Sequence, residues 1–125
     1  MKATVLLFHF SERDRRNRLT RALLPLHMKI KEIPKEHYLQ PVGWLAGEKE
    51  VQPVEEIYRG DELAGEMLLM AGLSGGQVDQ VLKAIRKSGI GPIPYKAVLT
   101  EGNKNWNVLQ LFEEIKAEHE QMRKE

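Results

Sequence analysis

The sequence predicts an α/β fold, a small three-layer sandwich in which a four-stranded, mainly parallel sheet of strand order 2-1-3-4 lies between helices. Two segments, residues 4–10 and 66–72, are apolar almost without interruption. Such runs are typical of strands that are covered on both faces. Strand-like and helix-like segments also alternate along the chain, which favours parallel strands joined by helical crossovers. These two observations predict a sheet enclosed by helices on both sides.

A ferredoxin-like α+β arrangement with an additional C-terminal helix is the alternative. In that arrangement the helices cover one face of the sheet, so the strands should alternate apolar and polar residues. The first and third predicted strands do not alternate. The sandwich is therefore the preferred prediction.

The first part of the chain, residues 1–33, predicts a β–α–β unit. After the first strand, Ser11 is expected to cap a helix, with Asp14 at the capping-box position. Pro25 interrupts the helical pattern and should end or kink this helix just before it. Residues 28–33 alternate apolar and charged side chains, which indicates a half-exposed edge strand.

Residues 34–65 predict an irregular connector. A short helix is expected around Pro41, and residues 54–58 have the composition of one more helical turn. Polar connectors move and vary more than the elements that they join. We therefore expect the most mobile or variable part of the protein in this segment.

The last part of the chain predicts a β–α–β–α unit over residues 66–119, followed by a frayed tail at residues 120–125. Ser74 and Gln77 form a capping-box pattern at the start of a helix, and Gly89 is a typical helix end. Another strand is then expected from Tyr95 to Leu99, and a final helix from about Asn105.

Composition limits the class of protein. A length of 125 residues suits a single domain, and a formal net charge of +1 argues against a polyanion binder that depends on bulk charge. The chain has no cysteine, which excludes disulfides, thiolate metal sites and a cysteine nucleophile. The N-terminal apolar run is too short for a secretory signal, and no segment reaches the ~18 apolar residues of a membrane span. We therefore expect a cytoplasmic protein without membrane attachment or a cofactor.

Known catalytic patterns are incomplete in this sequence. Residues 72–76 match the G-x-S-x-G elbow of serine hydrolases, but His119, in the charged last helix, is the one downstream histidine. Ser74 is therefore interpreted as a helix cap. No H-x-x-x-H or H-E-x-x-H spacing occurs, so no metal site is predicted. No predicted strand ends in the aspartate that a receiver-type phosphorylation site requires.

The densest group of side chains that could bind a ligand lies in residues 94–106. Because ligands collect at the carboxyl ends of parallel strands, Thr100, Asn103 and Asn105 are expected at one strand-end rim, together with Ser11 and the loop of Ser74. The same residues also have a structural interpretation, in which Thr100 and Asn103 are turn residues.

Three further residues of this segment have structural interpretations. Asn105 is expected to be the N-cap of the last helix and Trp106 an anchor in the core. Lys96 is a charge placed early in an otherwise apolar strand. It is expected either to extend outward from an edge position or to pair with a carboxylate.

Arginines cluster on the first predicted helix at Arg13, Arg15, Arg16, Arg18 and Arg21. Their spacing spreads them around the helix, which favours a solvated face. A surface for phosphate or for an acidic partner is the second interpretation. The interleaved aromatic residues of single-strand binders are missing, so nucleic acid is not an expected partner.

The C-terminal half carries a specific combined pattern. It consists of the strand from Met67 to Ala71 running into Gly72-Leu73, the motif Pro94-x-Lys96-Ala97-Val98-Leu99-Thr100-x-x-Asn103-x-x-Trp106, and Leu111-x-x-Glu114 with Glu118-His119. With these residues the segment 67–119 resembles a bacterial family known as a domain of unknown function, number 3783. In the N-terminal half, Gly43-x-Leu45-Ala46-Gly47 is the one suggestive piece. The resemblance implies a small α/β protein and supplies no activity.

Two hypotheses about function follow. The first is a non-enzymatic binding or regulatory module whose partner, an unknown protein, contacts a shallow, uncharged-to-basic strand-end rim and also the arginine-rich helix. The second is a binding protein for a small anionic ligand, or a minor enzyme. It requires one pocket in which five side chains converge, namely Thr100, Asn103, Lys96, Ser74 and Arg13.

Overall fold

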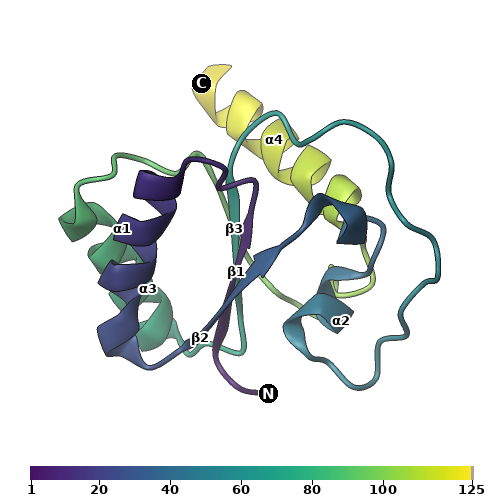
Figure 1. Cartoon of the computed structure of the whole chain (residues 1–125), viewed down its shortest axis with the longest axis horizontal. Coiled ribbons are helices and arrows are strands. Elements are labelled where there is room, and N and C mark those ends of the chain that lie inside the picture. Colours follow the sequence, from purple (N-terminus) through teal and green to yellow (C-terminus); the bar gives the residue numbers. More distant parts are fainter. Residues whose placement is uncertain (125) are drawn as a thin grey trace.

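A computed structural model describes residues 1–124, with the side chains of residues 1–122, and contains a four-stranded sheet between two layers of helices (Figure 1). The strands are β1 (Thr4–Phe8), β2 (Lys29–Ile33), β3 (Met67–Ala71) and β4 (Tyr95–Val98). The α-helices are α1 (Arg13–Leu23), α2 (Val42–Ala46), α3 (Gly75–Ser88) and α4 (Val108–Lys124). Short 3-10 helices span Leu24–Leu26 and Lys35–His37. No helix in this part of the chain is long and apolar enough to cross a membrane.

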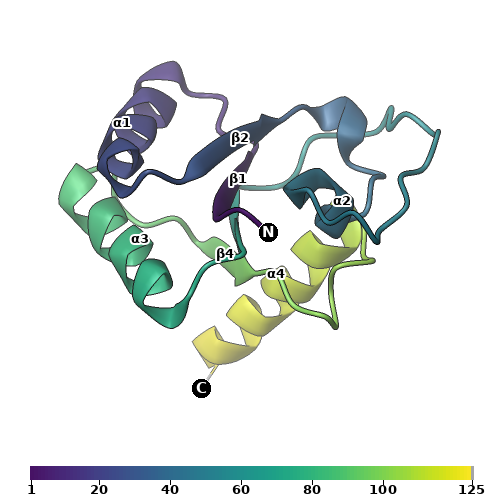
Figure 2. The same cartoon turned by 90° about the horizontal axis from the view of Figure 1, so that it is seen from below.

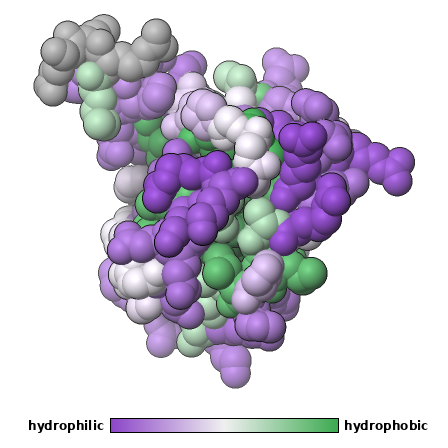
Figure 3. Space-filling view, turned by 90° about the vertical axis from the view of Figure 1, so that its left-hand side faces the viewer, coloured by the Kyte–Doolittle hydropathy of each residue, from purple (hydrophilic) through white to green (hydrophobic). Residues whose placement is uncertain are grey.

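The helices cover both faces of the sheet, so the predicted three-layer sandwich is confirmed and the ferredoxin-like alternative is wrong. Helices α1 and α3 lie on one face, seen from outside in Figure 3, and α2 and α4 lie on the other (Figures 1 and 2). All five residues of β1 and of β3 are buried. Val5 and Leu7 face the core under α1 and α3, whereas Leu6 and Phe8 face the core under α2 and α4. This alternation explains why β1 is apolar throughout.

The strand order is β2-β1-β3-β4, as predicted. Strand β1 pairs in parallel with β2, and β3 pairs in parallel with β4, but the central pair of β1 and β3 is antiparallel. The sheet is therefore mostly parallel and mixed. Strand β3 runs opposite to β1 because the connector leaves the sheet after Ile33 and returns to it before Met67 at the same edge. Both residues are level with Phe8. The carboxyl ends of the two parallel pairs lie at opposite edges of the sheet.

Sequence patterns predicted both ends of α3 and the end of α1, but not the start of α1. Ser74 and Gln77 form the predicted capping box of α3, which ends at Gly89 with a φ of 77°. Helix α1 ends at Leu23, before Pro25, as expected. The predicted capping box of Ser11 and Asp14 is wrong, because α1 begins after Glu12 without a side-chain cap. The Asp14 carboxylate instead pairs with Arg18 at 3.3 Å.

The connector contains the short helix α2 directly after Pro41, as predicted, but residues 54–58 form no helical turn. The buried Gln40 side chain holds the backbone of Val54 on both sides. Its Nε2 donates to the Val54 carbonyl at 2.7 Å, and its Oε1 accepts from the Val54 N–H at 2.9 Å. These bonds engage both the N–H and the C=O of Val54, and residues 54–58 have no helical hydrogen-bond pattern. The predicted helical turn is therefore wrong.

Helix α4 begins later and continues further than predicted. The Asn107 side chain, and not that of Asn105, accepts from a first-turn amide, the Gln110 N–H at 2.9 Å. Trp106 lies in the preceding turn and packs, partly buried, against the core under α2 and α4. The helix extends to Lys124, so residues 120–124 are helical, where a frayed tail was predicted. Glu125 lies outside the described residues.

Candidate functional site

A groove follows the free edge of β4 between α3 and α4. Figure 2 shows β4 between these two helices, and the last place in the strand order leaves its outer side without a neighbouring strand among the described residues. The volume of the groove is about 590 Å³. We call it the β4 groove; its lining includes Leu82, Lys96, Val98, Thr100, Asn103, Trp106, Ile115 and Glu118.

The backbone of β4 offers free hydrogen-bonding groups to this groove. The Leu99 N–H donates to the Met70 carbonyl of β3 at 2.8 Å. Since hydrogen-bonding groups alternate in direction along a strand, the N–H and C=O groups of Lys96 and Val98 point away from β3. An edge strand with such groups is a template for pairing with another chain.

The floor of the groove is apolar. The residue Val98 is 40% exposed, although valine is usually buried. It lines the groove together with Leu82 of α3, Ile115 of α4 and Trp106. An exposed apolar floor below free backbone groups is suited to an extended polypeptide more than to a small polar molecule.

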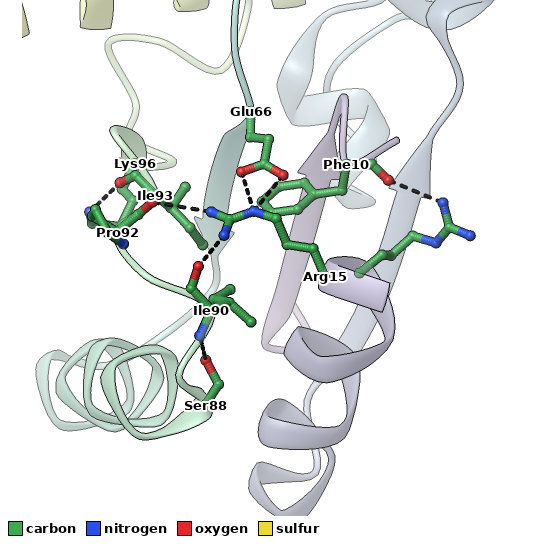
Figure 4. A network of polar contacts seen from close by, with 9 residues as sticks. Phe10, Arg15, Glu66, Ser88, Ile90, Pro92, Ile93 and Lys96 are labelled. Carbon is green, nitrogen blue, oxygen red and sulfur yellow. Dashed lines mark hydrogen bonds and ion pairs between the residues drawn. The ribbon is translucent and has the colours of Figure 1, made fainter. Parts of the chain in front are cut away.

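Carboxylates border the groove on its α4 side. Glu114 and Glu118 line the groove and are exposed. Among the described side chains, Lys96 is the one cation of the lining, and its Nζ donates to the Ile93 carbonyl at 2.6 Å (Figure 4). Of the two interpretations of Lys96, the edge position is confirmed and a carboxylate partner is absent among the described residues. The rim is more acidic than the first hypothesis predicted.

Thr100 and Asn103 use their side chains on each other's backbone. The Thr100 N–H donates to Asn103 Oδ1 at 2.9 Å, and the Asn103 N–H donates to Thr100 Oγ1 at 3.2 Å. In addition, Asn103 Nδ2 donates to the Val98 carbonyl at 3.1 Å. The pair therefore stabilises the turn after β4. Of the four outward backbone groups of the strand, the N–H and C=O of Lys96 and of Val98, the Val98 carbonyl is bonded by Asn103.

The same turn is fixed to α2 by backbone contacts. The Val42 N–H donates to the Trp106 carbonyl, and the Gly43 N–H donates to the Lys104 carbonyl, each at 2.8 Å. A Cβ atom at Gly43 would lie 2.7 Å from the Lys104 oxygen, so glycine is required here. On the other side of the turn, Lys104 pairs with Glu101 at 2.8 Å, which raises the pKa of the lysine.

Of the five predicted ligand residues, the structure brings three together in the β4 groove, namely Lys96, Thr100 and Asn103. Ser74 lies at the same edge of the sheet, but its side chain is used in the capping box of α3. Arg13 and Ser11 follow β1, whose carboxyl end lies at the opposite edge, level with the start of β4. The predicted single rim is therefore wrong, because the antiparallel central pair divides it into two.

A second polar site, which sequence patterns did not predict, lies at that opposite edge. His9 follows β1 with a φ of 63°, a strained conformation for a residue other than glycine. Its Nδ1 atom and the hydroxyl of the fully buried Tyr38 have no hydrogen-bond partner of good geometry among the described residues. Burial, and then the neighbouring Glu62 carboxylate, raise the pKa of Tyr38. No sequence motif indicates this juxtaposition, since the residues come from three separate segments.

The fold and the groove define the class of this protein, a small α/β sandwich with an open edge strand. Residues 66–122 match the model of a family described as Domain of unknown function (DUF3783). The resemblance predicted for residues 67–119 is thereby confirmed, and the family description assigns no activity. No curated protein and no solved structure matches the chain.

Proposed function

We propose that this protein is a non-enzymatic binding module of the bacterial cytoplasm that holds an extended segment of a partner protein in the β4 groove. Three outward backbone groups of β4 support this proposal, the N–H and C=O of Lys96 and the N–H of Val98. A partner segment can use them to add a fifth strand to the sheet. These free groups beside the exposed Val98 side chain are the observation that carries the proposal.

The charge of the groove indicates the chemistry of the partner segment. Glu114 and Glu118 face the groove, whereas the Lys96 ammonium is turned back to the Ile93 carbonyl. A segment that alternates apolar and basic residues would place apolar side chains on Val98 and Leu82 and basic side chains beside the carboxylates. Complementary charge of this kind favours the correct partner and its orientation.

The extent of the family match also supports the proposal. Residues 66–122 include β3, α3, β4, the turn and the described part of α4 that lines the groove. The segment that the family model describes is therefore sufficient to build the whole groove, without residues from the first half of the chain.

The alternative, a small-ligand or anion site formed by Lys96, Thr100 and Asn103, has less support. Thr100 and Asn103 already hydrogen-bond to each other's backbone, and Lys96 donates to a carbonyl. A small anion would have to compete with these bonds and with two nearby carboxylates. Three of the five residues that this hypothesis required line the same groove, and their polar groups already serve as structural partners.

The proposal is tested by selecting binders from a library of displayed, unstructured 12-residue peptides. We expect enriched peptides to alternate apolar residues with lysine or arginine. In hydrogen exchange with the bound peptide, the Lys96 and Val98 amides should become protected, whereas the Leu99 amide is already bonded to β3. Enrichment of acidic peptides, or binding that leaves the Lys96 and Val98 amides unprotected, would contradict the proposal.

A pair of variants at one position sharpens this test. Val98→Pro removes the outward N–H without removing a bond to β3, since proline is tolerated where the N–H of an edge strand faces solvent. Val98→Ala keeps the N–H and shortens the side chain. We expect Val98→Pro to weaken the selected peptide about 10-fold more than Val98→Ala does, in keeping with the loss of a backbone hydrogen bond. Thermal melts show whether both variants fold.

A further inference from the structure

A second groove lies between α1 and α3, on the face of the molecule shown in Figure 3. Its volume is about 830 Å³, larger than that of the β4 groove. Hydrophobic residues appear there at the bottom of a depression that strongly hydrophilic side chains border (Figure 3). We call it the basic groove; its principal lining residues are Arg18, Arg21, Ala22, Lys83, Ala84 and Lys87.

The two helices present matching stripes to this groove. Residues 18, 21, 22 and 25 of α1 and the following turn have the spacing i, i+3, i+4, i+7, and residues 80, 83, 84 and 87 of α3 have the same spacing. Positions with this spacing lie on one face of a helix. In both stripes the i+4 position is alanine, so small side chains line the floor between the two helices, and Pro25 and Leu26 complete the apolar lining at one end.

The charge of the basic groove has one sign. Each wall contributes two cations, and no carboxylate of residues 1–122 belongs to the lining. Arg18 pairs with Asp14 at 3.3 Å, and both side chains are more than half exposed, so this ion pair is weak. Arg21, Lys83 and Lys87 make no ion pair within the described part of the chain. Three full positive charges therefore surround the apolar floor.

We infer that the basic groove binds an acidic amphipathic helix of a partner protein. The alanines of the floor allow the axis of a third helix to approach closely, and helix-in-groove binding uses apolar anchors at i, i+3 or i+4, and i+7. Glutamates on both flanks of such a helix would face the arginines on one wall and the lysines on the other. The stripe on α1 is about 10 Å long, which corresponds to two turns of a bound helix.

Two other anionic partners fit the groove less well. A nucleic-acid backbone gains its affinity from phosphate contacts and would leave the apolar floor unused. An anionic bilayer receives a protruding apolar surface, whereas this floor is recessed between two walls. The basic groove and the β4 groove are separate surfaces, because they use different residues of α3. The proposal of a bound helix and the proposal of an added strand can therefore fail independently.

A displayed library of 18-residue helical peptides tests this inference directly. Its charged positions are either glutamate or lysine, and its remaining variable positions are either leucine or serine. Selection on the full chain should enrich glutamate, together with leucine at i, i+3 or i+4, and i+7. Enrichment of lysine, or of glutamate without the leucine pattern, would overturn the inference.

The selected peptide is then measured by fluorescence anisotropy against variants of the groove. We expect Lys83→Glu with Lys87→Glu to raise the Kd about 10-fold or more, as reversal of charge at a complementary interface does. The matched control, Lys29→Glu with Lys49→Glu, makes the same change in net charge elsewhere and should alter the Kd less than about twofold. Equal weakening by the two double variants would overturn the inference.

Two further measurements complete the test. Lys83→Gln with Lys87→Gln is the milder replacement if the glutamate variant does not fold, and it should also weaken the peptide by several fold. A 16-base-pair duplex and vesicles with phosphatidylserine are titrated under the same conditions. If either one binds more tightly than the selected peptide, and loses affinity in the same lysine variant, the surface serves that partner and the inference is wrong.

Discussion

The guanidinium Nε of Arg15 lies 2.7 Å from a carboxylate oxygen of Glu66, a residue that is 51 positions further along the chain. The same guanidinium donates to the carbonyls of Ile90 and Pro92, so one side chain joins α1 to the start of β3 and to the approach to β4 (Figure 4). The Arg15 and Glu66 side chains are 20% and 19% exposed. Arg15 is therefore a structural residue within the arginine cluster, distinct from the arginines of the basic groove.

Removal of the Arg15 side chain should destabilise the fold. Arg15→Ala leaves the mostly buried Glu66 carboxylate without its partner and frees two carbonyls, so we expect a loss of about 2–3 kcal/mol in the free energy of unfolding. Chemical denaturation measures this value. Arg13→Ala, at an exposed position of the same helix, is the control and should change stability by less than about 0.5 kcal/mol. Similar effects of the two variants would contradict the role assigned to Arg15.

Gly43 should tolerate no side chain. Gly43→Ala places a Cβ 2.7 Å from the Lys104 carbonyl oxygen, which forces the turn away from α2 and should cost about 1–3 kcal/mol. Gly75→Ala is the matched control, because no atom lies within 4 Å of its added Cβ. That control should be neutral or stabilising by up to about 1 kcal/mol. Thermal melts distinguish the two cases, and an unchanged melting temperature for Gly43→Ala would contradict the close approach.

Thr100 and Asn103 should behave as one unit in a double-mutant cycle. Each single replacement by alanine breaks the reciprocal bonds of the turn, and we expect each to cost about 1 kcal/mol. The double variant should cost clearly less than the sum, since either change alone already removes most of the shared geometry. Additive losses in urea unfolding would show that the two side chains act independently.

Tyr38 should make stability sensitive to alkaline pH. Burial and the Glu62 carboxylate raise the pKa of this phenol in the folded state, while in the unfolded state it ionises near its ordinary pKa of about 10. A raised folded pKa contributes stability that is complete below the unfolded pKa and is lost as pH increases from there towards the folded pKa. The expected loss from this residue is about 1.4 kcal/mol per pH unit above pH ~10.

Tyr38→Phe isolates this effect. The variant should be at least as stable as the wild type near neutral pH, because it removes a buried hydroxyl without a good partner. Its stability should decline less steeply between pH 10 and 11.5 in urea titrations, by about the slope given above. Tyr95→Phe, at a partly exposed tyrosine, is the control for the loss of a tyrosine hydroxyl as such. Parallel curves for Tyr38→Phe and the wild type would refute the assignment.

Local sequence signals were sufficient where neighbouring residues decide the structure. The continuous apolar run of β1 predicted a strand between two layers, because each of its faces needs a cover. Ser74 with Gln77 predicted the start of α3, and Pro25 predicted the end of α1, because caps and breakers act within one turn of the helix. The motif from Pro94 to Trp106 also belonged to the pattern that predicted the family match, and it contains Lys96, Thr100 and Asn103, which line the β4 groove.

The direction of β3 and the contacts between distant segments could not be predicted from local sequence patterns. The direction of β3 depends on where residues 34–66 return to the sheet. The path of this connector is held by contacts such as the two hydrogen bonds between the Gln40 side chain and the Val54 backbone. That direction separated Arg13 from Thr100 and divided the predicted rim. The partners of Arg15 and the approach of Gly43 to Lys104 join segments more than 50 residues apart. Local sequence patterns were therefore enough to predict the four strands, their order and the edge position of β4, whereas long-range contacts in the folded chain fixed which side chains are structural and which surfaces stay open. Hydrophobic periodicity and caps act locally, while the direction of a strand depends on the whole path of the chain.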